Sequence, residues 1–167
     1  EQHYNVDMIG SWSSHHMGEE VPNPDFDMDH EGHSGWTAAD IFSPPSWDSL
    51  RGNINSWLKS YNPGIVLIEL GINDVFQCRQ ADEIIKDIAK AIDHFRNKNQ
   101  PVKIFIAQIP PLGKQWSDKK LCGDSIDYAA RIIELNKKIA AFAKSANQKI
   151  SVVIAVDQYT GVDPSTD

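Results

Sequence analysis

Residues 65–74 read Ile-Val-Leu-Ile-Glu-Leu-Gly-Ile-Asn-Asp, and this stretch decides the fold class. Its first six residues are mostly apolar and β-branched, which is typical of a strand buried in a parallel sheet. Gly71, Asn73 and Asp74 follow the strand at once. Such residues often serve only as a turn. In open α/β sheets, however, sites lie at the carboxyl ends of the strands, so these residues are also candidates for a functional site.

Helices and strands alternate on both sides of this stretch. Ser46 is a plausible cap for the first helix, whose apolar face includes Leu50 and Ile54. Residues 11–46 are rich in Gly, Pro, His and Asp and are expected to form a long loop. The alternation predicts right-handed crossovers and a parallel sheet covered on both faces. Apolar spacing predicts helices over 47–61, 80–98 and roughly 126–146, and strands over 4–10, 65–70, 102–109 and 150–156.

The composition limits the classes of function. A chain of 167 residues fits one domain. A net charge of −7 argues against nucleic acid or an anionic membrane surface as a partner. No stretch approaches the roughly 20 apolar residues of a membrane span. No Gly-rich phosphate-binding motif follows a strand, so the sequence predicts no nucleotide cofactor.

The acidic loop before residue 32 has a metal-like composition. An EF-hand beginning at Asp25 would need Gly at its sixth position and Glu at its twelfth, and these are His30 and Trp36. The histidines at 15, 16, 30 and 33 lack the spacing of a zinc site. We therefore expect a solvated, hydrogen-bonded loop and no metal.

The segment His30-Glu31-Gly32-His33-Ser34-Gly35-Trp36-Thr37 lies in this long loop. Together with Gly71-Ile72-Asn73-Asp74 it resembles blocks II and III of the SGNH, or GDSL-type, esterase and lipase family. The resemblance implies that Gly35 and Asn73 donate hydrogen bonds to the oxyanion of an ester undergoing hydrolysis. Acyl transfer needs such preorganised donors where negative charge develops. It also implies a three-layer α/β/α sandwich with a flavodoxin-like parallel sheet and strand order 2-1-3-4-5.

Two other blocks of that family have no match here. Block I is a strand running into Gly-Asp-Ser, which supplies the nucleophile, and block V is a C-terminal Asp-x-x-His, whereas residues 95–167 contain no histidine. We therefore expect residues 1–167 to be a single domain that lacks the first strand and the last helix of the family. We also expect that this chain alone does not hydrolyse esters. In the strand order 2-1-3-4-5, the missing first strand would lie between residues 5–9 and residues 65–70. We therefore expect no hydrogen-bond ladder between these two segments. Gly123-Asp124-Ser125 spells the nucleophile motif but follows no buried strand, so Asp124 or Ser125 capping the next helix is the simpler interpretation.

The resemblance implies that the parent protein is a serine esterase acting on acetyl esters. The sequence style is similar to microbial carbohydrate esterases of the acetylxylan-esterase kind, so the expected partner is an ester substrate, with an acetylated carbohydrate as the narrower case. Trp36 and Asp74 are candidate substrate-binding residues, although Trp36 could equally pack in the core. The alternative function is a non-catalytic carbohydrate-binding or interaction module on the same scaffold.

The two cysteines follow neighbouring predicted strands. Cys78 comes after the strand that ends at residue 70, and Cys122 lies in the loop after the strand that ends at residue 109. Both loops leave the same edge of the sheet, so a Cys78–Cys122 disulfide is geometrically reasonable. Such a bond would favour an oxidising, secreted setting.

Overall fold

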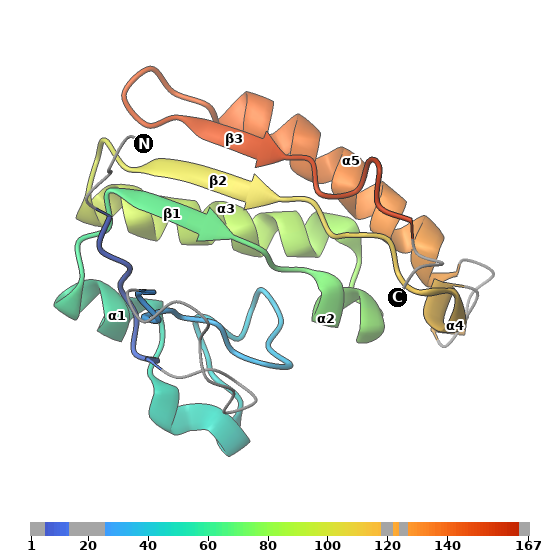
Figure 1. Cartoon of the computed structure of the whole chain (residues 1–167), viewed down its shortest axis with the longest axis horizontal. Coiled ribbons are helices and arrows are strands. Elements are labelled where there is room, and N and C mark those ends of the chain that lie inside the picture. Colours follow the sequence, from blue (N-terminus) through green and yellow to red (C-terminus); the bar gives the residue numbers. More distant parts are fainter. Residues whose placement is uncertain (1–5, 14–25, 118–121, 124–126, 164–167) are drawn as a thin grey trace.

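The computed structural model describes residues 6–13, 26–117, 122–123 and 127–163. Its elements follow one another as α/β units after a long N-terminal loop (Figure 1). The helices and strands are η1 (Ser46–Arg51), α1 (Ile54–Ser60), β1 (Ile65–Ile68), α2 (Ile72–Phe76), α3 (Ala81–Lys98), β2 (Lys103–Ala107), α4 (Lys114–Ser117), α5 (Tyr128–Ala146) and β3 (Val153–Val156).

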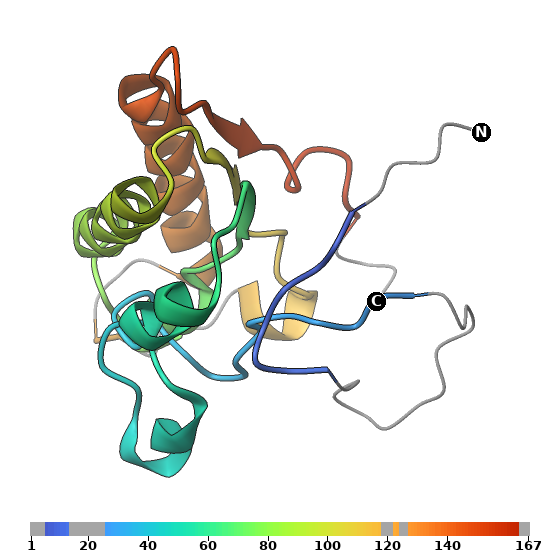
Figure 2. The same cartoon turned by 90° about the vertical axis from the view of Figure 1, so that its left-hand side faces the viewer.

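The three strands form one parallel sheet in the order β1-β2-β3. Ile68 of β1 is paired with Ile106 of β2, and Ile106 is paired with Ala155 of β3. α3 connects β1 to β2 and α5 connects β2 to β3, and both long helices lie on the same face of the sheet (Figures 1 and 2). The predicted α/β class with a parallel sheet is thereby confirmed, and the observed order matches the 3-4-5 part of the expected strand order.

The main core lies between this sheet face and the two long helices. α3 and α5 carry apolar residues at helical spacing, so each presents a continuous stripe to the strands. The fully buried members include Ile84, Ile88, Ile104, Ile132, Leu135 and Ile139. A second cluster of Trp36, Ile41, Ile54 and Ala91 joins the N-terminal loop to α1 and α3.

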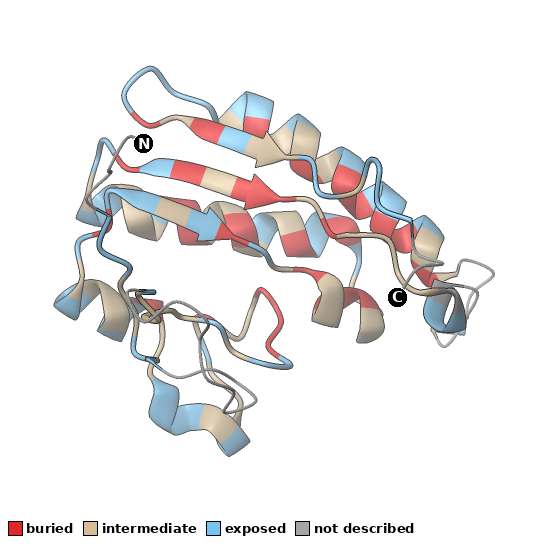
Figure 3. Cartoon of the chain, viewed as in Figure 1, coloured by how far each residue is buried: buried red, intermediate tan, exposed pale blue. Residues whose placement is uncertain are grey.

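The opposite face of the sheet is open within the described residues (Figure 3). Leu67 is 71% exposed, and Ile65 and Ile154 are exposed as well. The prediction that β1 is buried on both faces is therefore wrong for the described part of the chain. A run of apolar residues indicates that a strand is suited to burial on both faces. It does not indicate which segment covers each face. Of the three layers that the resemblance implies, the described residues form two.

The predicted strand at 4–10 is also wrong over its described part, residues 6–10, while residues 4 and 5 lie outside the described ranges. This segment crosses the loop that follows it instead of joining the sheet. Trp12 and His30 form an isolated antiparallel bridge, and the Met8 amide donates to the Asp27 carboxylate at 2.8 Å. Carboxylates of the acidic loop thus take backbone donors that a sheet edge would otherwise satisfy. No ladder joins residues 6–9 to β1 in the described structure, as expected.

The predicted helix at 47–61 is split in two. Gly52 has a φ of 79°, which ends η1, and the Asn53 side chain then caps α1 by accepting from the amides of Asn55 and Ser56. Ser46 therefore does not cap the helix, and Leu50 is 99% exposed instead of lying on its buried face. The short helices α2 and α4 were not predicted, because four or five residues are too few to show helical periodicity.

Candidate functional site

Gly71 sets the sharp turn from β1 into α2. Its φ of +127° favours glycine, and a Cβ there would lie 2.7 Å from the Leu135 Cδ2 atom. Glycine is thus required both by the backbone conformation and by the close approach of α5. The turn places Asn73 and Asp74 in the first turn of α2, beyond the carboxyl end of β1.

Asn73 lies beside the loop that carries Gly35. Its side-chain Nδ2 donates to the backbone carbonyl of Trp36 at 2.8 Å, across 37 residues of sequence. The amide carries two N–H groups, so this bond leaves a second donor for another acceptor. The structure therefore brings the two predicted donor segments together, while their catalytic role stays a prediction.

Gly35 is at the tip of a tight turn and has a φ of +80°. The Trp36 amide donates to the His33 carbonyl at 3.4 Å and closes this turn. Glycine adopts this conformation at no steric cost, and Gly35 is exposed. These features are compatible with the predicted donor role of the Gly35 amide.

Asp74 connects α2 to the segment after Trp36. Its side chain is 0% exposed, and its carboxylate accepts from the Ala38 amide at 2.9 Å. The same carboxylate pairs with the Arg79 guanidinium, which also contacts Asp87 at 2.6 Å. Burial raises the pKa of Asp74, while the Ala38 amide and Arg79 oppose that rise. The contacts give Asp74 a structural role, and its predicted contact with substrate stays a prediction.

Trp36 is 2% exposed and packs in the second core cluster. Its indole Nε1 donates to the Asp48 carboxylate at 2.9 Å. Of the two roles that the sequence left open, the structure shows packing. A direct contact between Trp36 and substrate stays a prediction.

His33 was quoted in the motif but given no role by the sequence. Its ring lies nearly parallel to the indoles of Trp36 and Trp57, with centroid distances of 4.0 and 5.2 Å, and the two indoles are themselves 6.1 Å apart. Its Nε2 lies 3.1 Å from the Glu31 carboxylate, and its Nδ1 lies 3.8 Å from that of Asp48. These ring and carboxylate contacts hold His33, whose carbonyl accepts the hydrogen bond that closes the Gly35 turn. Its only sequence signal is the concentration of His and Trp around the motif.

The acidic loop is held by hydrogen bonds, as predicted. The Ser11 amide and hydroxyl both donate to the Glu31 carboxylate, at 2.7 and 2.9 Å. Among the residues that the structure describes, no group of three or more His, Cys, Asp or Glu side chains is arranged to hold a metal ion. His15 and His16 lie outside the described ranges.

Cys78 and Cys122 form the expected disulfide, with their Cα atoms 5.4 Å apart. The bond ties the end of α2 to the loop that precedes α5. Asp124 and Ser125 of the Gly123-Asp124-Ser125 segment lie outside the described residues. The prediction that Asp124 or Ser125 caps this helix is wrong, because α5 begins at Tyr128 and its cap is Asp127, whose side chain accepts from the Ala130 amide at 2.8 Å.

Comparison with known proteins supports one family. A sequence model of the GDSL-like lipase/acylhydrolase family matches residues 4–158. A multidomain esterase of Ruminococcus flavefaciens is 32% identical over 177 residues, which cover 98% of this chain and 21% of that protein.

Solved structures give the same result. A carbohydrate esterase family 3 structure from Talaromyces cellulolyticus aligns with a TM-score of 0.72 and 33% identity, over 92% of this chain and 64% of that one. An acetyl esterase mutant with acetate ion aligns at 0.69 and 34% identity over the same shares of each chain. A Clostridium thermocellum family 3 carbohydrate esterase aligns at 0.57 and 26% identity, covering 89% of this chain and 59% of that one. The chain thus spans less than two thirds of each of these relatives. Among the described residues, no helix is long and apolar enough to cross a membrane.

Proposed function

Since this chain belongs to the GDSL-like lipase/acylhydrolase family, we propose that the whole protein is a serine esterase that removes acetyl groups from carbohydrates. The relatives support this substrate class, because they are named as a multidomain esterase, family 3 carbohydrate esterases and an acetyl esterase. The resemblance of residues 30–37 and 71–74 to family blocks II and III supports the same reaction.

The observation that carries the proposal is the bond from the Asn73 amide to the Trp36 carbonyl. It holds a side-chain amide next to the exposed Gly35 turn, at the carboxyl end of a parallel strand. Two neutral donors in one place suit an ester oxygen that becomes negative as the carbonyl carbon turns tetrahedral. We assign the oxyanion-binding role to the Gly35 amide and the second N–H of Asn73.

The reaction would follow the serine esterase scheme. A serine hydroxyl attacks the ester carbonyl carbon while a histidine takes its proton, and the oxyanion receives the two hydrogen bonds. The sugar hydroxyl then leaves with the proton from the histidine, and water hydrolyses the acetyl-serine by the same route. No residue of this chain is assigned to the nucleophile, to the base or to its orienting carboxylate.

The test is Asn73→Ala in the full-length protein, assayed with acetylated xylo-oligosaccharides. We expect kcat to fall by about 10²–10³-fold with little change in KM, because the amide acts on charge that develops only in the transition state. Asn97→Ala, at an exposed position on α3, is the matched control and should leave kcat unchanged. Unchanged kcat in Asn73→Ala would contradict the assigned role.

The same assay separates the alternative function. A non-catalytic carbohydrate-binding module would bind acetylated oligosaccharides in calorimetry but release no acetate from them. Acetate release by the wild-type protein would instead support the esterase.

We also propose that the protein is secreted. The Cys78–Cys122 disulfide supports this, because disulfides persist mainly in oxidising compartments. Alkylation of protein from the native host, followed by peptide mass spectrometry, would test it. Free thiols at both positions would count against secretion.

A further inference from the structure

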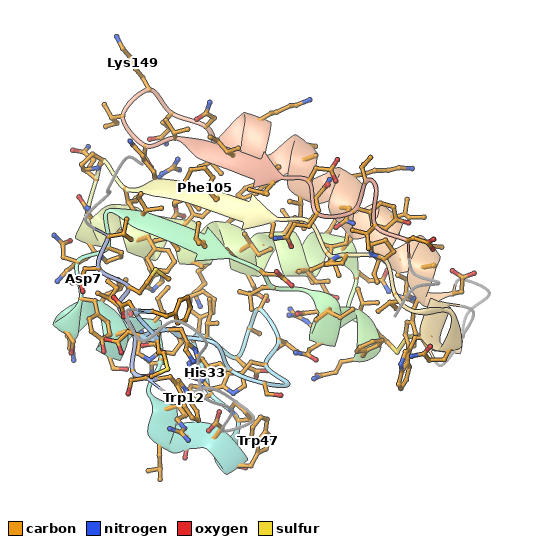
Figure 4. All side chains as sticks on the ribbon, in the orientation of Figure 1. Asp7, Trp12, His33, Trp47, Phe105 and Lys149 are labelled. Atoms are coloured by element: carbon orange, nitrogen blue, oxygen red, sulfur yellow. A yellow bond between two sulfur atoms is a disulfide. The ribbon has the colours of Figure 1, made fainter. Side chains whose placement is uncertain are left out.

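Trp47 exposes a large aromatic ring on η1, at the outer end of the molecule (Figure 4). Its side chain is 68% exposed. Single exposed apolar residues are common on protein surfaces, so exposure alone implies no role. What distinguishes Trp47 is the residue that it borders.

The indole of Trp47 lies against the Gly35 turn. A Cβ placed on Gly35 would be 3.7 Å from Cη2 and 4.0 Å from Cζ2 of Trp47, so the edge of the six-membered ring faces the glycine. Any group bound at the Gly35 amide would therefore have the indole as a near neighbour.

The neighbours of Trp47 hold η1 in place. Asp48 accepts from the Trp36 indole at 2.9 Å, and Trp36 directly follows Gly35. Asp48 also pairs with Arg51 at 3.4 Å, and the Arg51 guanidinium lies 3.4 Å from the centre of the Trp12 ring. These contacts connect the residues that follow Trp47 to Trp36 and Trp12, so the exposed ring is presented on a fixed support.

We propose that Trp47 is a specificity-determining residue that stacks on the sugar ring carrying the acetyl group. This inference rests on the proposed function. A pyranose ring presents C–H groups on one face, and an indole offers a broad apolar face with a negative π-system that receives them. The acetyl carbonyl at Gly35 and the sugar over Trp47 would then be the two ends of one bound ester. The contact between an indole and a sugar ring needs no charged group, so it is compatible with a neutral substrate and with the net charge of −7.

The test compares two substrates in the full-length protein. Ethyl acetate has the reacting group but no sugar ring, and acetylated xylotetraose has both. In Trp47→Ala we expect KM for acetylated xylotetraose to rise about 10- to 100-fold, the loss typical of one aromatic stacking contact, while kcat/KM for ethyl acetate stays within about twofold. Trp47→Tyr and Trp47→Phe should restore most of the lost affinity, because they restore an aromatic face, whereas Trp47→Leu should not.

Leu50→Ala is the matched control, since Leu50 is exposed on the same short helix. It should change neither substrate's kinetics. Equal losses on both substrates in Trp47→Ala would show that Trp47 acts through the Gly35 turn and would overturn the specificity role. Unchanged kinetics on both would overturn it as well. Failure of the wild-type protein to hydrolyse either ester would instead refute the proposed function.

Discussion

Replacing Asp74 by alanine should break the link between the two segments that hold Gly35 and Asn73. The Asp74 carboxylate is fully buried, accepts from the Ala38 amide at 2.9 Å and pairs with Arg79. Alanine removes both interactions and leaves the buried Ala38 amide without its acceptor. Of the two hydrogen bonds described between α2 and the loop that follows Gly35, the one from Asn73 to the Trp36 carbonyl would then remain.

The size of the effect follows from the two partners. A buried amide without an acceptor costs about 1–3 kcal/mol. The loss of the Arg79 pair adds about 1 kcal/mol, well below the cost for a fully buried pair, because Arg79 is partly exposed and keeps Asp87. We therefore expect Asp74→Ala to lower the free energy of unfolding by about 2–4 kcal/mol. Asp74→Asn keeps the shape and one acceptor oxygen, so it should cost about half as much.

Urea denaturation of the full-length protein and its variants would measure these values, with hydrogen exchange at the Ala38 amide as a local readout. Faster exchange of this amide in Asp74→Ala than in Asp74→Asn is expected. A change in unfolding free energy below about 0.5 kcal/mol, within the range of ordinary surface substitutions, would refute the reasoning.

The burial of Asp74 also predicts a pH dependence. The folded-state pKa of Asp74 is raised above its ordinary value of 3.8 by burial, so the folded protein holds this proton more tightly than the unfolded chain does. The associated stability is fully present below pH 3.8 and is lost as the pH rises through the raised pKa. Arg79→Met removes an opposing cation and should raise that pKa further. As the pH rises from 3.8 through the raised pKa, the total loss of stability should be larger in Arg79→Met than in the wild type or in Arg51→Met, and equal losses would contradict this account.

Three further predictions concern single positions. Gly71→Ala should lower the unfolding free energy by about 1–3 kcal/mol, because its Cβ would meet Leu135 and its φ is positive, whereas Gly64→Ala, with open space around it, should not. Cys78→Ser should lower the unfolding free energy by about 2–4 kcal/mol, because its disulfide closes a loop of 44 residues; melting under identical non-reducing conditions measures it. Ser125→Ala should leave turnover of p-nitrophenyl acetate by the full-length protein unchanged, and complete loss would identify Ser125 as the nucleophile.

Much of the fold could be predicted from local patterns. α3 and α5 were found from helical spacing over 18 and 19 residues, and β2 from a run of apolar residues. Local patterns do not predict the structure where one residue overrides them or where segments distant in sequence interact. Gly52 interrupts an apolar spacing that otherwise continues, although Asn53 followed by Ser56 is a recognisable cap signal. Backbone amides at Met8 and Ser11 donate to acidic side chains about 20 residues away in sequence, and no local pattern predicts such contacts.

In the candidate site, too, some features could be predicted from the sequence and others could not. The Gly-x-Asn-Asp turn and the His-x-Gly-x-Ser-Gly loop could be read from the sequence, and the structure brings them together. The contacts that hold them could not be predicted, because they join residues far apart in sequence. Asp74 meets the Ala38 amide across 36 residues, and the partners of His33 come from both η1 and α1. Only the folded arrangement specifies these pairs.

This arrangement gives the two halves of the site different physical roles. Asp74 is held by a buried hydrogen bond and Asn73 by a partly buried one, so substitutions there disturb the packing of α2 and the position of a proposed oxyanion donor together. Trp47 borders the same site from an exposed helix, so its replacement removes contact area without leaving a cavity or an unpaired buried group. On the proposed function, substitutions on α2 should therefore lower stability and kcat together. Substitution of Trp47 should change KM for the sugar ester while the unfolding free energy stays within about 0.5 kcal/mol of the wild type.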